Sequence, residues 1–314
     1  MANPNPTTHF HFSTVTGIFL QDEKSTDPDT SDFVSSNFGL INRAYLSDSD
    51  DTKERTQWQR LKLYLDELNV SSPSDTQYKL LFLGRHGQGV HNVAESRYGT
   101  VMWDCRYSLL NGDEHGDWFD ARLTDIGIDQ ARTVNKAWKT QIQNGIPPPE
   151  SFYVSPLIRC CETAQHSFEN SGLPGTEPFR PVVKELLRET LGLHTCDARS
   201  PKSTIQAFFP SYVFEPGFSE EDKLHKPSLR ESDSARDARF YEFLSDIFGN
   251  DGNTVLSLTA HSGAIMSILS VVGHRPFVVN TGGVIPVLVK AERREGKEKE
   301  RVVEPWFEKP AYPN

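Results

Sequence analysis

Short apolar runs and longer amphipathic stretches alternate along this chain. The short runs predict buried strands, because turn residues flank them; they lie at 78–83, 151–154, 182–186, 254–259 and 281–290. Apolar side chains at helical spacing predict helices within 51–69, 93–98, 124–144, 157–168, 234–248 and 264–272. Strands that alternate with helices are typical of an α/β protein with a mostly parallel sheet and helices on both faces.

Three segments fall outside this alternation, and we expect all three to belong to one domain with a core at 78–290. Residues 1–77 are polar and turn-rich up to their one helix, so they predict an N-terminal extension. The stretch at 191–231 has several prolines and no long period, which predicts an insertion over one edge of the sheet, as a lid or pocket rim. The charged run that opens 291–314 predicts a solvated turn or tail.

The composition fits a globular protein and excludes some partners. Of the 314 residues, 36% are hydrophobic and 24% charged, and no apolar run is long enough to span a bilayer. The N-terminus lacks a basic start and an apolar stretch, so we expect a cytoplasmic protein, with a nuclear location also open. The net charge of −10 argues against nucleic-acid binding but permits a small phosphorylated substrate, bound by clustered arginines and histidines. The oligomeric state is left open.

The cysteines predict neither a disulfide scaffold nor a zinc site. The chain has four, Cys105, Cys160, Cys161 and Cys196, and no CxxC pair. The adjacent Cys160 and Cys161 are interpreted as small packing residues in a helix.

Polar side chains follow four of the predicted strands. Arg85 and His86 come after the run 78–83, and Arg159 opens the helix after 151–154. Glu189 follows the third strand and His261 follows 254–259. Because the carboxyl ends of parallel strands meet at one edge of a sheet, we expect these side chains to converge there.

Two arginines, two histidines and a carboxylate at one edge suit phosphoryl transfer. A neutral His86 imidazole can attack phosphorus and carry the phosphoryl group. Arg85 and Arg159 can fork onto its nonbridging oxygens, and His261 can add a donor and positive charge. Glu189 can protonate the leaving oxygen and later activate water. This arrangement requires no metal and no cofactor.

Each of these residues alone has an ordinary explanation. Arg159 would form a salt bridge, Glu189 would be a solvated charge and His261 would bond backbone. His86 and His91 could be metal ligands, but their spacing in a glycine-rich loop is not a recognised zinc pattern. The shared position of the set after strands favours a joint site.

Four motifs carry a family resemblance. They are LGRHG at 83–87, LTDIGIDQA at 123–131, SPLIRCCETA at 155–164 and AHSG at 260–263. In this order they resemble the signature of the histidine phosphatase (phosphoglycerate mutase-like) superfamily. The extended RHGQGVHN form, the HTCDARS segment and the long N-terminal lead resemble a fungal phosphomutase-like branch of it.

The resemblance implies a role for each matching residue. His86 would be the phosphorylated histidine, and Glu189 would be the proton donor. The phosphate pocket would be lined by Arg85, Arg159 and His261. Further substrate contacts are expected from Gln88, His91, Asn92 and Ser262.

Two departures from the family pattern bear on the reaction. Gly89 stands where glycolytic mutases carry a serine that helps to hold substrate, and 190–200 is unlike their substrate-clamping sequence. Both favour metal-independent hydrolysis of phosphomonoesters over a phosphoglycerate-type mutase, which is the second hypothesis. A phosphate-binding protein with an inactive site is the third. We expect an irregular loop at 99–120 to form a pocket wall and, with the insertion, to select the substrate.

Overall fold

A computed structural model describes residues 8–52, 54–297 and 301–309. Within these residues a seven-stranded sheet has the order β1-β9-β2-β8-β5-β6-β7. Five strands run parallel: β2 (Thr76–Arg85), β8 (Val255–Ala260), β5 (Ser151–Val154), β6 (Val182–Val183) and β7 (Val213–Phe214). At one side, β9 (Val284–Glu295) and β1 (Thr8–Thr14) pair antiparallel.

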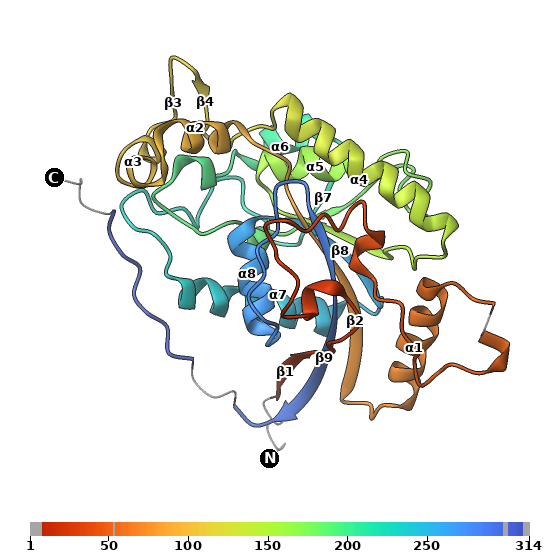
Figure 1. Cartoon of the computed structure of the whole chain (residues 1–314). Helices are drawn as coiled ribbons and strands as arrows, with labels where there is room; N and C mark the ends of the chain where they lie inside the picture. The colour runs from red at the N-terminus through yellow and green to blue at the C-terminus, as the bar shows by residue number, and fades with distance from the viewer. Residues whose placement is uncertain (1–7, 53, 298–300, 310–314) are drawn as a thin grey trace.

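Helices cover both faces of this sheet (Figure 1). One face packs against α1 (Gln57–Ser71), α4 (Asp125–Gln143) and α5 (Ile158–Phe168), and the other against α7 (Asp233–Asn250) and α8 (Ser262–Val271). Strand β2 serves both cores, because successive side chains of a strand point to opposite faces. Leu80 and Phe82 enter the first core and Leu81 and Leu83 the second. The predicted α/β fold is confirmed.

The charged segment after residue 290 is not the solvated tail that the sequence predicts, at least up to Glu295. Strand β9 continues to that residue, with β1 on one side and β2 on the other, and Ala291 is fully buried. Pairing on both edges satisfies the backbone, so the charged side chains need only project outward. Glu292 does so between Lys290 and Arg294. Residues 298–300 and 310–314 of the predicted tail lie outside the described residues.

The interval 99–120 is more regular than the loop that the sequence predicts. It contains the helix α3 (Thr100–Cys105), a 3-10 helix and a hairpin of β3 (Gly112–Asp113) and β4 (Gly116–Asp117). Trp103 and Trp118 pack edge to face, with ring centroids 5.5 Å apart, and give this segment a small core of its own. The two tryptophans thus order a segment whose sequence shows no period, together with apolar side chains from α2 and the insertion.

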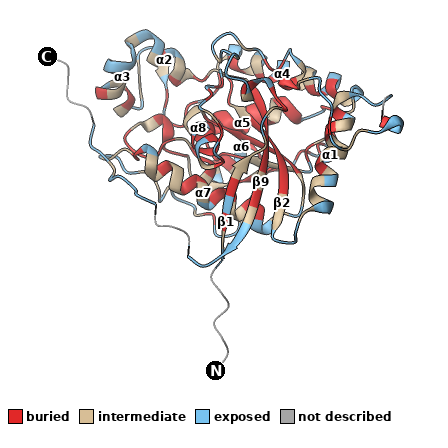
Figure 2. Ribbon diagram, turned by 60° about the horizontal axis from the view of Figure 1, so that its bottom comes forward, coloured by how far each residue is buried: buried red, intermediate tan, exposed pale blue. Residues whose placement is uncertain are grey.

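The N-terminal extension and the insertion both add strands to the sheet. Figure 2 shows the buried residues continuing from the sheet into the packed elements around it. β1 lies at one edge, and β7, from the insertion, lies at the other. The insertion also holds α6 (Lys202–Phe208) and is pinned by the buried Arg188, which donates to Asp222 at 2.6 and 2.7 Å. The division into extension, core and insertion stays a prediction. None of the described helices is long and apolar enough to span a membrane.

Candidate active site

The register of the two central strands brings two histidines together. In the parallel pair of β2 and β8, Arg85 lies opposite Ala260, so the next residues, His86 and His261, leave the sheet side by side. The His86 N–H donates to the Ala260 carbonyl at 3.0 Å, and the two imidazole centroids lie 5.2 Å apart. The predicted convergence at the carboxyl ends of the strands is therefore present for both histidines.

Two glycines hold the loop after His86 against helix α4. A Cβ at Gly87 would lie 2.3 Å from the Gly127 carbonyl oxygen, and one at Gly127 would lie 2.2 Å from the Gln88 carbonyl oxygen. Only glycine allows such an approach of two backbones. The helix begins beside this contact, where Thr124 accepts from the Gly127 N–H at 3.2 Å as its N-cap.

Gln88 faces α4 and is not among the residues that line the pocket. Its backbone N–H donates to Gln130 Oε1 at 2.7 Å, and its side-chain Oε1 accepts from the Thr124 hydroxyl at 2.8 Å. These two bonds hold the loop against α4, so the structure does not bring Gln88 to the pocket, and its predicted substrate contact stays a prediction.

A cavity of about 220 Å³ opens at this edge of the sheet. We call its inner part the floor, made of the five residues predicted from the strand ends: Arg85, His86, Arg159, Glu189 and His261. Four of these line the cavity, and His261 lies against His86 with no exposed surface. We call its outer part the rim, made of Glu95, Asp104, His194 and Arg230. The interval 99–120 and the insertion each contribute to the rim, as expected of a pocket wall.

His86 is prepared as a neutral nucleophile. Its Nδ1 lies 2.7 Å from the Gly87 carbonyl oxygen, which can only accept, so the proton sits on Nδ1 and the lone pair on Nε2. Burial, followed by the charges of Arg159 and other neighbours, holds the pKa of His86 well below its usual 6.5. The imidazole is therefore uncharged near neutral pH, as its predicted role requires.

The two arginines of the floor are more committed to the protein than the sequence suggests. Arg159 donates one Nη to the Cys196 carbonyl and the other to Asp197 Oδ1 at 2.8 Å, and Arg85 donates Nη1 to the Val279 carbonyl at 2.9 Å. Both Nε atoms are buried and have no hydrogen-bond partner among the described residues. A guanidinium has five N–H donors, so Nε–H and the remaining Nη–H groups are those left for an oxyanion.

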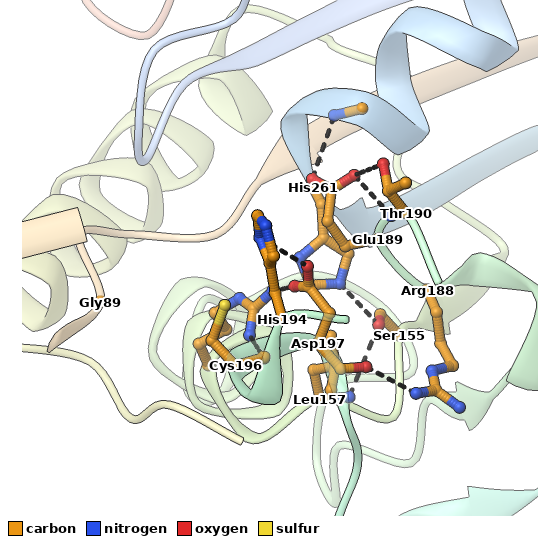
Figure 3. A network of polar contacts seen from close by, with 12 residues as sticks. Gly89, Ser155, Leu157, Arg188, Glu189, Thr190, His194, Cys196, Asp197 and His261 are labelled. Carbon is orange, nitrogen blue, oxygen red and sulfur yellow. Dashed lines mark hydrogen bonds and ion pairs between the residues drawn. The ribbon is translucent and has the colours of Figure 1, made fainter. Parts of the chain in front are cut away.

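Glu189 is fixed by hydrogen bonds to both carboxyl oxygens (Figure 3). Oε1 accepts from the Thr190 N–H at 2.8 Å and from its hydroxyl at 3.2 Å, and Oε2 accepts from the Gly263 N–H at 3.1 Å. A Cβ at Gly263 would lie 2.2 Å from Oε1, so the glycine after Ser262 makes room for this carboxyl group. Ser262 itself lines the pocket as the first residue of α8, where backbone N–H groups favour an anion.

His261 is held by Ser155, whose Oγ lies 2.7 Å from its Nε2. Burial, together with Arg159 and the other two histidines, lowers the pKa of His261 well below 6.5. The positive charge that the sequence predicts for His261 is therefore absent near neutral pH, because the ring is buried and because Arg159, His86, His91 and Arg85 share this space.

His91 and Asn92 lie together on α2 (Val90–Tyr98) and both line the pocket. The His91 ring centroid is 5.3 Å from that of His86, and its buried Nδ1 has no partner among the described residues. Asn92 caps the helix, because its Oδ1 accepts from the Gly89 N–H at 2.9 Å. A Cβ at Gly89 would lie 2.6 Å from His91 Nδ1, so His91 occupies the space that a serine side chain would enter.

Comparison with known sequences shows the family. The sequence model of the histidine phosphatase superfamily (branch 1) matches residues 81–278, more than half of the chain. The chain belongs to the histidine phosphatase superfamily. It is similar to a probable phosphoglycerate mutase of Arthroderma benhamiae, with 50% identity over 90% of this chain and 84% of that protein. It is 36% identical to a probable phosphoglycerate mutase of Saccharomyces cerevisiae, over 79% of this chain and 92% of that protein. The predicted fungal phosphomutase-like branch is confirmed.

Two solved structures are also similar to parts of the chain. A mycobacterial glucosyl-3-phosphoglycerate phosphatase is 20% identical and matches 62% of this chain and 79% of its own, with a TM-score of 0.36. An ecdysone phosphate phosphatase from Bombix mori is 17% identical and matches 62% of this chain and 76% of its own, with a TM-score of 0.37.

Sequence reasoning missed the residue that joins floor and rim in this member of the superfamily. Asp197 Oδ1 accepts from Arg159 at 2.8 Å, and its Oδ2 accepts from Arg230 at 2.8 Å. Its carbonyl accepts from Arg188 at 2.6 Å (Figure 3). The pKa of Asp197 is held far below its usual range, because the arginines and His194 outweigh its burial. The run HTCD at 194–197 was a usable signal, since it places three reactive side-chain types together. Arg230 offered none.

One group of side chains in the described part of the chain has ligand atoms close enough to hold a metal ion. His194, Cys196 and Asp197 place one ligand atom each within 4.8 Å of the others. Asp197 is already bound by Arg159 and Arg230, and burial raises the pKa of the Cys196 thiol well above its usual 9.0. A cation here would have to displace guanidinium groups and a proton, so these donors do not fit a metal site.

Proposed function

We propose that this histidine phosphatase superfamily member is a metal-independent phosphatase that hydrolyses phosphomonoesters of small metabolites through a phosphohistidine at His86. The observation that carries the proposal is the state of His86, a neutral imidazole with its proton held at Nδ1 by Gly87. The side chains of Arg85 and Arg159 line the same cavity, and their buried Nε–H donors have no partner among the described residues. Arginine donors that lack a partner are suited to acceptor oxygens such as those of a phosphate.

The reaction takes two steps at this site. In the first, His86 Nε2 attacks phosphorus, the ester P–O bond breaks, and protonated Glu189 gives its proton to the departing oxygen. Arg85 and Arg159 stabilise the charge on the transferring group. In the second, Glu189 removes a proton from water as its oxygen attacks phosphorus. The N–P bond then breaks, and phosphate and neutral His86 are released.

A phosphoglycerate-type mutase is the second candidate, and the names of the two fungal relatives favour it. A mutase has to shield its phosphohistidine from water and hold the dephosphorylated substrate until the group returns. The packing at residue 89 argues against this, because His91 fills the space beside Gly89 that the serine of glycolytic mutases would enter. Hydrolysis is the outcome when water reaches the intermediate.

The decisive experiment traps the intermediate. Incubation with 4-nitrophenyl phosphate, followed by an alkaline quench, is expected to leave acid-labile phosphate on His86, detected by peptide mass spectrometry, and free phosphate in solution. The His86→Ala variant loses both while keeping the wild-type circular dichroism spectrum. Phosphate release that survives in His86→Ala would overturn the mechanism.

Two further outcomes separate the rival functions. With 3-phosphoglycerate and a bisphosphoglycerate primer, formation of the isomer without free phosphate would establish a mutase. Absence of both phosphohistidine and free phosphate with every monoester would leave a phosphate-binding protein. The intact floor argues against that outcome. The cytoplasmic location stays a prediction from the sequence.

A further inference from the structure

The pocket has too few positively charged side chains to neutralise a substrate with two anionic groups. Apart from histidines and Cys196, the ionisable side chains that line it are three arginines and four carboxyl groups: Arg85, Arg159, Arg230, Glu95, Asp104, Glu189 and Asp197. Of these, Glu189 carries a proton at the start of the proposed reaction. The lining histidines add no compensating charge near neutral pH, because burial lowers the pKa of His86, His91 and His194, the last to about 3.

The arginines are already assigned. Arg159 and Arg230 hold the two oxygens of Asp197, each at 2.8 Å. Arg230 Nη1 also donates to the Thr190 carbonyl at 3.0 Å and the Gly192 carbonyl at 2.7 Å. Arg85 and Arg159 are needed for the transferring phosphoryl group. Among the described residues that line the pocket, none supplies a cation for a second anionic group.

The carboxylates of the rim are at the outer part of the cavity. Asp104, on α3, has a side chain 39% exposed, and its Oδ1 lies 3.6 Å from His194 Nε2. Glu95, on α2, follows His91 by four residues, so the two side chains share one helix face and both line the pocket. An alcohol attached to a phosphate in the floor would extend toward these two carboxylates.

We propose that Glu95 and Asp104 select the substrate, so that the site accepts phosphomonoesters of uncharged, hydroxyl-bearing alcohols and rejects esters with a second anionic group. Hydroxyl groups can donate to both carboxylates, whereas a carboxylate or second phosphate would be repelled by them in a partly desolvated cavity. This inference rests on the proposed phosphatase activity and names the class of alcohol for the same site.

A matched pair of substrates tests the selection. Glycerol 3-phosphate and 3-phosphoglycerate have the same chain length and differ only in a hydroxymethyl group against a carboxylate. Wild-type kcat/KM for phosphate release is expected to favour glycerol 3-phosphate. In the double variant Glu95→Gln, Asp104→Asn, the ratio of the two kcat/KM values shifts toward 3-phosphoglycerate by about tenfold or more. The reason is that removing a charge repulsion equivalent to about one pKa unit changes kcat/KM by a factor of about ten.

A control variant and a salt series guard the interpretation. Glu114→Gln removes one negative charge from a side chain that is 83% exposed in the turn between β3 and β4. This control is expected to leave the ratio of the two kcat/KM values at its wild-type value. In the wild type, the preference for glycerol 3-phosphate weakens as ionic strength rises, because salt screens the partly exposed rim. This second measurement needs no variant to fold.

The outcomes separate this inference from the function on which it rests. Two results would overturn the selection by Glu95 and Asp104 and leave the phosphatase proposal standing. One is a wild type that prefers 3-phosphoglycerate, and the other is a folded double variant whose ratio stays within about twofold of wild type. If the wild type released no phosphate from either ester or from 4-nitrophenyl phosphate, the phosphatase proposal itself would fail and this inference with it.

Discussion

The floor and the rim of the pocket are positioned by different kinds of structure. Floor side chains leave the ends of neighbouring strands, so the sheet register that pairs Arg85 with Ala260 also sets His86 beside His261. Rim side chains come from α2, α3 and the insertion, where no shared ladder fixes them. His86 is 2% exposed, whereas the Asp104 side chain is 39% exposed. The position of the floor residues depends on the sheet, whereas the proposed choice of substrate depends on segments whose sequence can change while the sheet stays the same.

Asp197 is the one point where the two parts share a carboxylate. It binds Arg159 of the floor with one oxygen and Arg230 of the rim with the other. The same kind of ion pair thus binds Arg159, which is 1% exposed, and Arg230, whose side chain is 14% exposed. This symmetry offers matched substitutions that test the difference between floor and rim.

The largest effect is expected from Arg159→Lys compared with Arg230→Lys. A lysine at either position keeps one charge for Asp197 but loses the planar fork. At Arg159 the loss falls on the transferring group and should reduce kcat/KM by about 10³-fold. At Arg230 it should reduce kcat/KM by about tenfold or less. Steady-state rates with 4-nitrophenyl phosphate measure both, and equal losses would erase the distinction.

Asp197→Asn should unfold more easily than any single surface change. It leaves the buried Arg159 guanidinium without its carboxylate, and breaking a buried pair costs about 3–5 kcal/mol of unfolding free energy. The control is Asp129→Asn, which breaks an exposed pair with Arg132 and should cost no more than about 1 kcal/mol. Urea unfolding compares the two, and a similar shift in both midpoints would contradict the structural link between floor and rim.

Glu189→Gln should separate good from poor leaving groups. An alkyl phosphate needs a proton on its departing oxygen, so its kcat/KM should fall by about 10²-fold, within the usual range for a lost general acid. An aryl phosphate such as 4-nitrophenyl phosphate leaves as a stable anion and should lose only about threefold. Parallel losses on both substrates would show that Glu189 positions other groups and does not donate the proton.

The smallest effect concerns pH. In the folded chain His86, His91 and His261 have pKa values well below 6.5, whereas in the unfolded chain they titrate near 6.5. The unfolded state therefore takes up more protons as pH falls, and stability drops below about pH 6.5 by about 1 kcal/mol per histidine by about pH 5.5. His91→Gln should lessen that drop by about 1 kcal/mol in urea unfolding at the two pH values. An unchanged pH dependence would place His91 outside the buried cluster.

The floor could be predicted because strand ends are visible in the sequence. An apolar run that stops at a glycine, followed by Arg85 and His86, marks both the strand and its exit. A second β-rich run, 254–259, ends two residues before His261. Once the sheet is parallel, geometry requires these residues to meet. The same reasoning could not assign protonation, because the neutral state of His261 depends on burial among groups that the sequence does not place.

The sequence predicts the segments that form the rim but not the individual rim residues, because these are joined only through tertiary contacts. Arg230 reaches the pocket by donating to the Gly192 carbonyl and to Asp197, and nothing near it in sequence indicates either partner. The orientation of Gln88 could not be predicted for a related reason, since its side chain bonds Thr124, the N-cap of α4, and the local pattern does not place that helix beside the loop. Strand β9 extends beyond residue 290, where the sequence predicts its end, because β1, more than two hundred residues earlier, pairs with it.

The contact between Gly89 and His91 constrains how this site could diverge. A side chain at residue 89 and an imidazole at residue 91 compete for one volume, since a Cβ at Gly89 would lie 2.6 Å from Nδ1 and 2.7 Å from Cε1 of His91. The two positions are therefore coupled: a serine at 89 requires the His91 side chain to move or to be replaced by a smaller residue. For a lineage or a laboratory selection moving toward the serine-bearing loop, the order of steps without a clash is the one in which residue 91 changes first.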